Sequence, residues 1–179
     1  MIMFIERFYP TKYYASSYEI DYESLYADGI RGLIYDLDNT LVPHDAPADE
    51  RALGLLNSLK EMGFEIFFLS NNKEARVKMF NEKIGAKYIF KASKPSAKGY
   101  LKAAKMMGLK PKQVAVIGDQ LFTDIWGANK AGMCSCLVVP IDRSTDKPQI
   151  VLKRYLENPI LKKYLKTHEM AKKIQNNEK

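Results

Sequence analysis

Short apolar runs alternate along the chain with segments of helical periodicity. The strongest runs are Leu33–Tyr35, Phe64–Leu69 and Val114–Ile117, and weaker ones cover Lys87–Phe90 and Ser135–Val139. Continuous apolar runs of this length are typical of parallel strands that are buried on both faces. Strands that alternate with helices predict an α/β fold with a parallel sheet and right-handed crossover connections.

The segments between these strands carry signals for helix starts and stops. Asp49 has the position of an N-cap, and glycine follows the end of each periodic segment, where a left-handed residue can close a helix. The expected helices are Asp49–Met62, Lys73–Ile84, Ser96–Met107 and Thr123–Ala131, which stop at Gly63, Gly85, Gly108 and Gly132.

Polar side chains follow four separate strands of the predicted sheet. These clusters are Asp36, Asp38 and Thr40; Ser70 and Asn71; Lys94; and Asp119 with Asp124. Because the carboxyl ends of parallel strands share one edge, we expect the clusters to converge on one crevice. Several carboxylates are costly to bury without partners, but they suit Mg²⁺, a cation that prefers oxygen ligands.

Composition sets the class of protein. The 179 residues, 46% hydrophobic and 27% charged, predict one globular domain with a full core. No apolar stretch approaches the roughly 20 residues of a spanning helix, and Glu6 and Arg7 interrupt what would be the apolar core of a signal peptide. These features indicate a cytoplasmic protein. Cys134 and Cys136 are interpreted as small buried residues on a late strand in preference to a metal or redox pair.

The net charge of +7 is unevenly distributed. Acidic residues gather around the first cluster, whereas basic residues are concentrated in residues 73–112 and in the C-terminal tail. This distribution favours an anionic partner such as a phosphate ester, an acidic membrane surface or nucleic acid. The alternative is that the lysine-rich helix faces are ordinary solvated surface.

The two ends of the chain differ from the central part. We interpret residues 1–30 as an aromatic N-terminal arm, residues 31–145 as the core that carries the polar clusters and residues 146–179 as a basic C-terminal helical tail. The arm is expected to pack on the core, with contact at a membrane interface as the alternative. Pro159 is expected to start the tail helix. Ile160, Leu161, Tyr164 and Leu165 share one face of that helix, which would either dock on the core or lie on an anionic bilayer.

Four motifs in order resemble the haloacid dehalogenase-like (HAD) superfamily of phosphatases. They are D-L-D-N-T from Asp36, S-N-N from Ser70, K-P from Lys94 and G-D-Q-L-F-T-D from Gly118. The resemblance implies a Rossmann-like three-layer α/β/α fold. The segments between the first, second and third motifs are each long enough for only one helix and one strand, so the protein is expected to be capless, with an open crevice.

The resemblance also implies roles for the acidic residues. Asp36 would be the nucleophile that forms an aspartyl-phosphate, and Asp38 the general acid and base. Mg²⁺ would lie between the Asp36 carboxylate, the Asp38 carbonyl and Asp119. Asp124 would bind it through water or orient Lys94.

The remaining polar residues of the motifs would contact the substrate. Thr40 is expected to support Asp38 near the phosphate. Ser70, Asn71 and Lys94 are expected to hold phosphoryl oxygens as charge shifts during transfer. For Ser70, Asn71 and Asp124 the structural alternative is a helix cap.

Over nearly the whole chain, the aromatic arm and the motifs together resemble the YqeG-type branch, subfamily IIIA. That branch is similar to the phosphatidylglycerophosphate phosphatases of mitochondria and plastids. This likeness implies a lipid phosphate substrate and peripheral contact with the inner face of an anionic membrane. The alternatives are a soluble phosphatase for sugar, nucleotide or polynucleotide phosphates, and an RNA- or ribosome-associated binding protein. The basic residues of 73–112 are nearly all Lys, so this segment lacks the interleaved arginines and aromatics of RNA-reading surfaces, which argues against nucleic acid.

Overall fold

The computed structural model describes residues 2–168 and 173. Its centre is a six-stranded parallel sheet with the strand order β1-β6-β5-β2-β3-β4. The strands are β1 (Lys12–Tyr14), β2 (Gly32–Tyr35), β3 (Glu65–Leu69), β4 (Lys87–Ile89), β5 (Val114–Gly118) and β6 (Cys134–Val138). The predicted parallel sheet is therefore confirmed, and β2 lies between β3 and β5.

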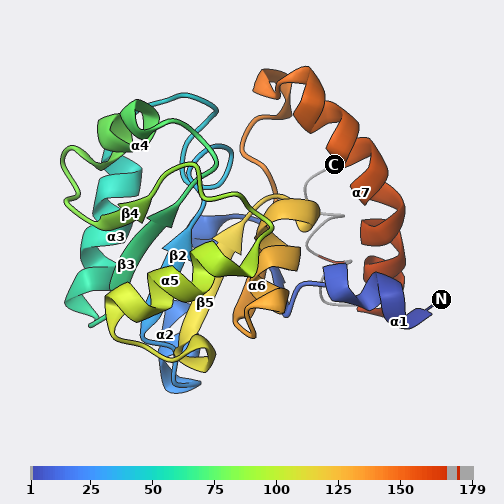
Figure 1. Ribbon diagram of the computed structural model, residues 1–179, viewed down its shortest axis with the longest axis horizontal. Coiled ribbons are helices and arrows are strands. Elements are labelled where there is room, and N and C mark those ends of the chain that lie inside the picture. The colour runs from blue at the N-terminus through green and yellow to red at the C-terminus, as the bar shows by residue number, and fades with distance from the viewer. Residues whose placement is uncertain (1, 169–172, 174–179) are drawn as a thin grey trace.

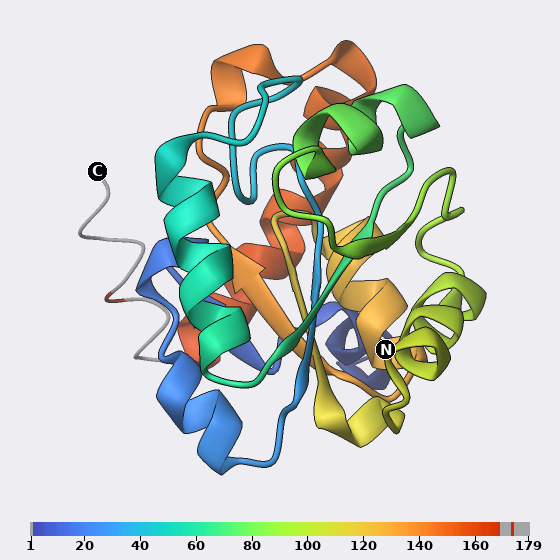
Figure 2. The ribbon, with the colours of Figure 1, turned by 90° about the vertical axis from the view of Figure 1, so that its left-hand side faces the viewer.

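Helices cover both faces of the sheet, which gives the expected three layers (Figure 1). The helices are α1 (Ile2–Ile5), α2 (Tyr22–Ala27), α3 (Glu50–Glu61), α4 (Glu74–Asn81), α5 (Ala97–Met107), α6 (Trp126–Lys130) and α7 (Pro148–Thr167). Short 3₁₀ turns occur at Glu6–Phe8, Ser17–Glu19, Pro111–Gln113 and Arg143–Thr145, and a π-helical turn covers Leu121–Ile125. Figure 2 shows the sheet edge-on between the two helical layers.

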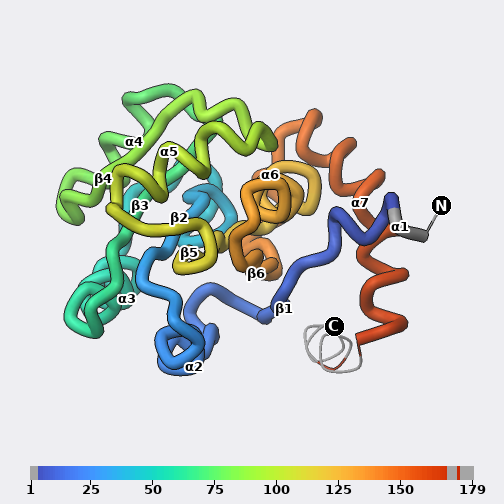
Figure 3. Tube along the Cα trace, turned by 60° about the horizontal axis from the view of Figure 1, so that its bottom comes forward, coloured from blue at the N-terminus to red at the C-terminus, as the bar shows by residue number. Residues whose placement is uncertain are grey.

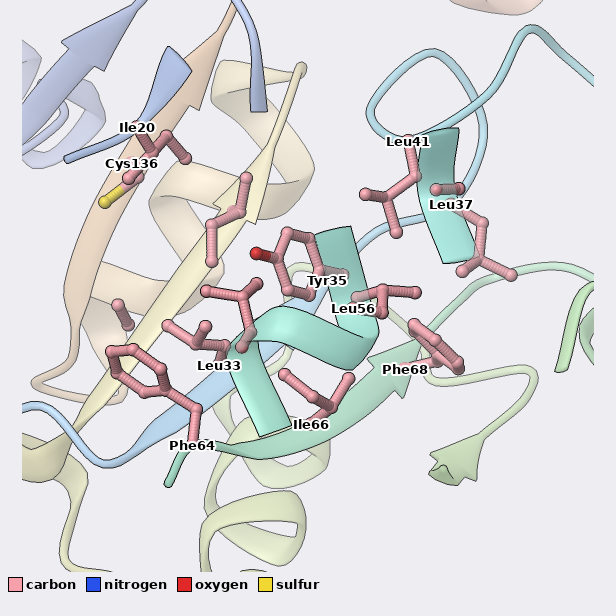
Figure 4. Packing of buried hydrophobic residues seen from close by; sticks show 14 of the residues in the cluster. Ile20, Leu33, Tyr35, Leu37, Leu41, Leu56, Phe64, Ile66, Phe68 and Cys136 are labelled. Atoms are coloured by element: carbon pink, nitrogen blue, oxygen red, sulfur yellow. The ribbon is translucent and has the colours of Figure 1, made fainter. Parts of the chain in front are cut away.

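Each face of β2 contributes to a different part of the core. Leu33 and Tyr35 pack beneath α2, α3 and α4, with Leu56 and Phe68 among their neighbours (Figure 4). Ile34 points to the opposite face, where α5 and α6 cover the sheet. This alternation explains why β2 is apolar at every position, because both faces of the strand are buried.

The predicted helix boundaries agree closely with the structure. The Asp49 carboxylate accepts a hydrogen bond from the Ala52 N–H, as expected of an N-cap, and Ser96 caps α5 in the same way. Helix α4 ends at Asn81, earlier than the predicted Ile84. Cys134 and Cys136 are free thiols on β6.

The aromatic N-terminal arm packs on the core and extends the sheet. Its strand β1 pairs with β6, with Tyr13 opposite Leu137, a pairing that the sequence pattern did not predict. Phe8, Tyr13 and Tyr22 are all buried, so these aromatic side chains are not available for the contact with a membrane interface that was the alternative for this arm. Tyr22 belongs to the hydrophobic cluster beneath α3, and Tyr13 to a smaller cluster with β6 and α7, so the arm is part of the packed interior.

The arm also holds the loop that follows β2. The Ser17 hydroxyl donates a hydrogen bond to the Thr40 carbonyl at 2.6 Å, and the Tyr18 hydroxyl donates to the Leu41 carbonyl at 2.5 Å. Tyr22 donates to the Ser17 carbonyl at 2.6 Å and accepts from the buried Tyr35 hydroxyl at 2.6 Å. A chain of hydrogen bonds thus connects β2 to the arm and to its own loop.

Replacing Tyr22 with Phe tests this chain. The change leaves the Tyr35 hydroxyl and the Ser17 carbonyl buried without their partner, and each unsatisfied group costs about 1–3 kcal/mol. We expect the free energy of unfolding in urea to fall by about 2 kcal/mol. Tyr155→Phe is the matched control, because Tyr155 is 72% exposed, and it should change stability by less than about 0.5 kcal/mol. Equal effects of the two changes would contradict the role given to Tyr22.

The start of the C-terminal helix differs from the prediction. Helix α7 begins at Pro148 and continues through Pro159, whereas Pro159 was expected to start it. Proline is favoured in the first turn of a helix, and in the structure Pro148 occupies that turn. Pro159 lacks the N–H that would bond the Tyr155 carbonyl, and Tyr155 is exposed, so water can satisfy that carbonyl.

The predicted apolar face of the tail helix docks on the core. Tyr164 and Leu165 are buried against β1, β6 and the π-helical turn, and Ile160 and Leu161 pack beside them. Figure 3 shows α7 beside the N-terminal segment. Of the two alternatives for this face, docking is the one observed. Residues 169–172 and 174–179 of the predicted tail lie outside the described residues.

No helix among the described residues is both long and apolar enough to cross a membrane.

Candidate active site

The predicted polar clusters meet at the carboxyl edge of the sheet. Asp36 directly follows β2, and Asp119 directly follows the neighbouring strand β5. Ser70 follows β3 on the other side of β2. Together they line a crevice of about 180 Å³, here named the acidic crevice, with Asp38, Asn71 and Lys94. The convergence expected from the sequence is therefore present, and it arises because β2 is central in the sheet.

The centre of the acidic crevice is a buried cluster of three carboxylates and an ammonium group. Lys94 Nζ donates to Asp36 Oδ1 at 2.6 Å and to Asp124 Oδ1 at 2.7 Å. Three carboxylate oxygens, one each from Asp36, Asp119 and Asp124, lie within 4.8 Å of one another. All four side chains are buried, so their charges interact strongly and the geometry of the cluster is fixed by its partners.

Glycine at position 118 makes this cluster possible. A Cβ atom on Gly118 would lie 2.4 Å from Asp124 Cγ, which no side chain could tolerate. Asp124 belongs to the π-helical turn after β5, and its Oδ2 accepts a hydrogen bond from the Gln120 N–H at 3.2 Å. The turn therefore bends back toward the strand and brings Asp124 within hydrogen-bonding distance of Lys94.

Burial raises the pKa of Asp36. The nearby carboxylates of Asp124 and Asp119 raise that pKa further, while Lys94 opposes the rise. Burial also raises the pKa of Asp119, and Arg154 opposes the rise most strongly. Keeping these carboxylates ionised thus requires the positive charges around them.

Asp38 lies at the side of the acidic crevice and is held by residues that the sequence analysis missed. Its Oδ1 accepts hydrogen bonds from Arg76 Nε at 3.1 Å and Arg76 Nη2 at 2.7 Å, and its Oδ2 accepts from Asn72 Nδ2 at 2.5 Å. His44 also lines the crevice, with Nδ1 3.8 Å from Asp38 Oδ2. Arg76 comes from α4, and no motif marks it as a partner of Asp38.

Thr40 supports a different carboxylate from the one expected. Its hydroxyl lies 3.4 Å from Asp119 Oδ1, whereas the sequence suggested support of Asp38. Thr40 is buried, and its carbonyl accepts a hydrogen bond from the Ser17 hydroxyl. Its side chain therefore helps to fix Asp119.

Ser70 and Asn71 follow β3 as predicted, and both bond to neighbouring backbone. Ser70 Oγ accepts from the Asn72 N–H at 3.1 Å within the turn after β3, and the N-cap position of α4 is occupied by Lys73, so Ser70 and Asn71 are not helix caps. Asn71 Oδ1 accepts from the Lys94 N–H at 2.7 Å, and its Nδ2 donates to the Lys94 carbonyl at 3.2 Å. Asn71 thus positions the backbone of Lys94, and both residues also line the crevice.

Helix α7 supplies a side chain that nothing in the sequence assigned to the site. Arg154 Nη2 donates to Asp119 Oδ2 at 2.5 Å, and Arg154 Nε donates to Asp146 Oδ2 at 2.5 Å. Asp146 in turn accepts from Asn39 Nδ2 at 2.8 Å. The tail therefore forms one wall of the acidic crevice, on a side where the sequence analysis had assigned no residue.

Comparison with known proteins agrees with this geometry. Residues 43–132 match a family described as a hydrolase, haloacid dehalogenase-like hydrolase. The chain is 41% identical over 138 residues to the probable phosphatase YqeG of Bacillus subtilis, covering 76% of this chain and 80% of that protein. The chain belongs to the HAD-like hydrolase family. It is thus a HAD phosphatase, as the motifs predicted.

This HAD phosphatase also resembles a plant enzyme. It is 28% identical over 164 residues to the chloroplastic and mitochondrial phosphatidylglycerophosphate phosphatase 1 of Arabidopsis thaliana, covering 82% of this chain and 45% of that protein. Among solved structures, the cobalt-bound deoxy-D-mannose-octulosonate 8-phosphate phosphatase of Haemophilus influenzae superposes with a TM-score of 0.53. That match has 16% identity and covers 73% of this chain and 75% of the other. It supports the fold.

The HAD phosphatase carries no inserted cap domain in the described part of the chain. Only a loop and α3 connect β2 to β3, and only α4 lies between β3 and β4. The capless expectation is confirmed on this point. In place of a cap, the N-terminal half of α7 lies beside the acidic crevice, where Gln149, Ile150 and Lys153 line its rim.

Glu157 of α7 gives the HAD phosphatase a pH-dependent element of stability. Its Oε1 accepts from the Phe122 N–H at 2.7 Å, and burial raises its pKa from 4.5 to about 7. Because the folded pKa exceeds the unfolded one, the contribution of Glu157 is most favourable below pH 4.5 and decreases as the pH rises to about 7. Above that pH Glu157 is ionised in the folded protein, and its unfavourable contribution to the free energy of folding has reached its full value.

Replacing Glu157 with Gln should remove this pH dependence. The amide oxygen can still accept from Phe122, but the side chain no longer ionises. We expect the variant to gain about 2 kcal/mol over the wild type between pH 4.5 and pH 8. Urea unfolding of both proteins at the two pH values gives this difference. Stability curves that stay parallel across this range would be evidence against a buried ionising Glu157.

Proposed function

We propose that this chain is a Mg²⁺-dependent phosphomonoesterase that acts through an aspartyl-phosphate on Asp36. The observation that carries the proposal is the buried cluster of Asp36, Asp119, Asp124 and Lys94 at the carboxyl edge of the sheet. Phosphoryl transfer needs a positioned nucleophile and positive charge around the transferred oxygens. This cluster offers both in one crevice.

The reaction proceeds in two displacements. In the first, an Asp36 carboxylate oxygen attacks phosphorus, the bond from phosphorus to the ester oxygen breaks, and Asp38 gives its proton to the leaving alkoxide. In the second, Asp38 takes a proton from water and the resulting hydroxide attacks the same phosphorus. Inorganic phosphate leaves and Asp36 is regenerated as a carboxylate. Asn72 and Arg76 hold Asp38 in position for both proton transfers.

The cations of the chain stabilise the charge of the phosphoryl group. Lys94 lies between Asp36 and Asp124, so its ammonium is adjacent to the attacking oxygen. Ser70 is placed on the opposite side of β2 and offers its hydroxyl to a phosphoryl oxygen. Asn71 contributes by fixing the backbone of Lys94, and Asp124 by orienting its ammonium.

The donor set fits a divalent metal ion. Three buried carboxylates face the charges of Lys94 and Arg154, and hard carboxylate oxygens are the ligands that Mg²⁺ prefers. Asp36, Asp119 and the Asp38 carbonyl would hold the ion, with Asp124 supporting it from beside Lys94. When bound, Mg²⁺ supplies positive charge for the phosphoryl oxygens.

The proposed substrate is a lipid phosphate, with phosphatidylglycerophosphate first. Two observations support it: the name of the Arabidopsis relative and an apolar surface beside the crevice. On α7, Val151, Leu152, Tyr155 and Leu156 are all more than half exposed. They lie on one side of the helix, opposite the side that carries Arg154, and Lys147 and Lys153 flank them. Exposed apolar and aromatic residues beside lysines are suited to the surface of an anionic bilayer.

The membrane surface proposed here differs from the one expected from the sequence. The residues expected there were Ile160, Leu161, Tyr164 and Leu165, which dock on the core, whereas the exposed apolar residues lie in the first half of α7.

Phosphate release is the test of this proposal. Phosphatidylglycerophosphate in anionic vesicles is compared with a panel of soluble phosphate esters, each with and without Mg²⁺, with Asp36→Asn protein as the blank. We expect Mg²⁺-dependent release that is strongest from the vesicles, and co-sedimentation of the protein with them. Activity confined to soluble esters would keep the phosphatase chemistry and reject the lipid substrate. No release from any ester would reject the proposed function.

A further inference from the structure

A second recess adjoins the acidic crevice on the side of α6. It has a volume of about 340 Å³, larger than the crevice itself, and is here named the aromatic recess. Its apolar lining consists of Phe8, Pro95, Phe122 and Trp126. These residues come from the N-terminal arm, the loop after β4, the π-helical turn and α6, which meet beside α7 (Figures 1 and 3).

The aromatic recess is continuous with the acidic crevice. Lys94, Thr123 and Lys153 line both. Lys94 bonds directly to Asp36, so the recess begins one residue away from the proposed nucleophile. A ligand whose phosphate occupies the crevice therefore has a direct path into the recess for its apolar part.

The walls of the recess are held by contacts among themselves. The Phe8 ring packs edge-on against Phe122 and tilted against Trp126, with centroids 5.1 Å apart in both pairs. Lys130 packs over the Trp126 ring, with Nζ 4.0 Å from the ring centroid. Because these rings are already packed, a ligand would meet a formed surface and would not have to order it.

The chemistry of the recess matches an amphiphile. Its walls are aromatic and aliphatic, so hydroxyl groups of a sugar would lose hydrogen bonds to water there without gaining partners on the rings. Hydrocarbon placed against the same rings gains free energy from burial. Lys94 and Lys153 at the junction supply positive charge where a phosphate would lie.

We propose that the aromatic recess binds the hydrocarbon portion of an amphiphilic phosphate monoester while its phosphate lies in the acidic crevice. This inference rests on the proposed function and adds the place where the apolar part of the substrate is recognised. The N-terminal arm thereby takes part in substrate selection through Phe8, in addition to its structural role.

A series of alkyl phosphates tests the recess apart from any membrane. The ratio of kcat/KM for octyl phosphate to that for ethyl phosphate is measured below the concentration at which octyl phosphate forms micelles. Burial of about two methylene groups would raise this ratio roughly tenfold in the wild type. Phe122→Ser should bring the ratio close to one.

Met106→Gln is the matched control for the loss of an apolar side chain. Met106 is 40% exposed near the end of α5, away from the recess, so the ratio should stay at the wild-type value. A wild-type ratio near one, or a ratio that Phe122→Ser leaves unchanged, would overturn the inference while leaving the phosphatase proposal intact.

A binding measurement keeps the recess testable without turnover. Trp126 is the single tryptophan of the sequence, so its fluorescence reports on the recess directly. Octylphosphonate, which has no ester bond to hydrolyse, should change the emission in a saturable way, whereas ethylphosphonate should not. If no ester is hydrolysed, the proposed function fails, and the octylphosphonate titration alone decides whether the recess binds hydrocarbon. An unchanged emission would overturn the inference.

Discussion

Replacement of Asp36 with Asn is expected to lower turnover by at least about 10³-fold and to leave the fold intact. The side chain keeps its size, but an amide cannot act as the nucleophile that forms an aspartyl-phosphate. Lys94 retains its bond to Asp124, so no buried cation loses all of its partners. The loss of one negative charge also relieves repulsion from Asp119 and Asp124. Phosphate release with Mg²⁺ and urea unfolding measure the two effects separately.

Asp28→Asn serves as the control for this change. Asp28 is an exposed carboxylate that pairs with Lys12 at 3.0 Å, away from the acidic crevice, and its replacement should alter turnover by less than about twofold. A brief reaction with substrate labelled on the phosphoryl group should leave label on the wild type and none on Asp36→Asn. Turnover near the wild-type level in Asp36→Asn would exclude Asp36 as the nucleophile.

The parts of the fold that were predicted correctly depend on local patterns. The run from Leu33 to Tyr35 is apolar because both faces of β2 are covered, and the carboxylates that follow it lie at the edge of the sheet. The cap at Asp49 and the stop at Gly108 are also local, since each involves residues within one turn. Such signals survive in a single sequence because neighbouring residues determine them.

The features that were missed depend on contacts between distant segments. Strand β1 has three residues, too few for a periodic pattern, and it forms because β6 offers an open edge. Arg154 reaches Asp119 because α7 docks through Tyr164 and Leu165, and nothing near position 154 records that docking. The same holds for Arg76, whose partner is 38 residues earlier in the chain.

This difference explains why the sequence predicted the polar residues of the site more completely than the residues that form its walls. The residues of the four motifs follow strand ends, so sheet topology alone brings them together. The walls come from the π-helical turn, α6, α7 and the N-terminal arm, whose positions depend on tertiary packing. Substrate selection is proposed to depend on those walls, and it was accordingly the least predictable property.

Replacement of Lys94 with Met is expected to impair both stability and activity. Methionine fills the space of the aliphatic stem but removes the ammonium that pairs with Asp36 at 2.6 Å and Asp124 at 2.7 Å. Removing one partner of a buried ion pair costs about 3–5 kcal/mol, because the remaining charges stay buried without compensation. Turnover should fall by at least about 10²-fold, since the phosphoryl oxygens lose a fixed positive charge. Urea unfolding and phosphate release measure these losses.

Mg²⁺ should restore part of the lost stability in Lys94→Met. The variant holds three buried carboxylates with one fewer positive charge around them, so a divalent cation compensates more repulsion there than in the wild type. We therefore expect a larger Mg²⁺-induced increase in Tm for Lys94→Met than for the wild type. Lys98→Met, at an exposed position in the first turn of α5, should match the wild type in both stability and Mg²⁺ response. An equal Mg²⁺-induced shift in all three proteins would contradict the charge compensation argued here, and no shift in any of them would show that the carboxylate cluster does not bind the cation.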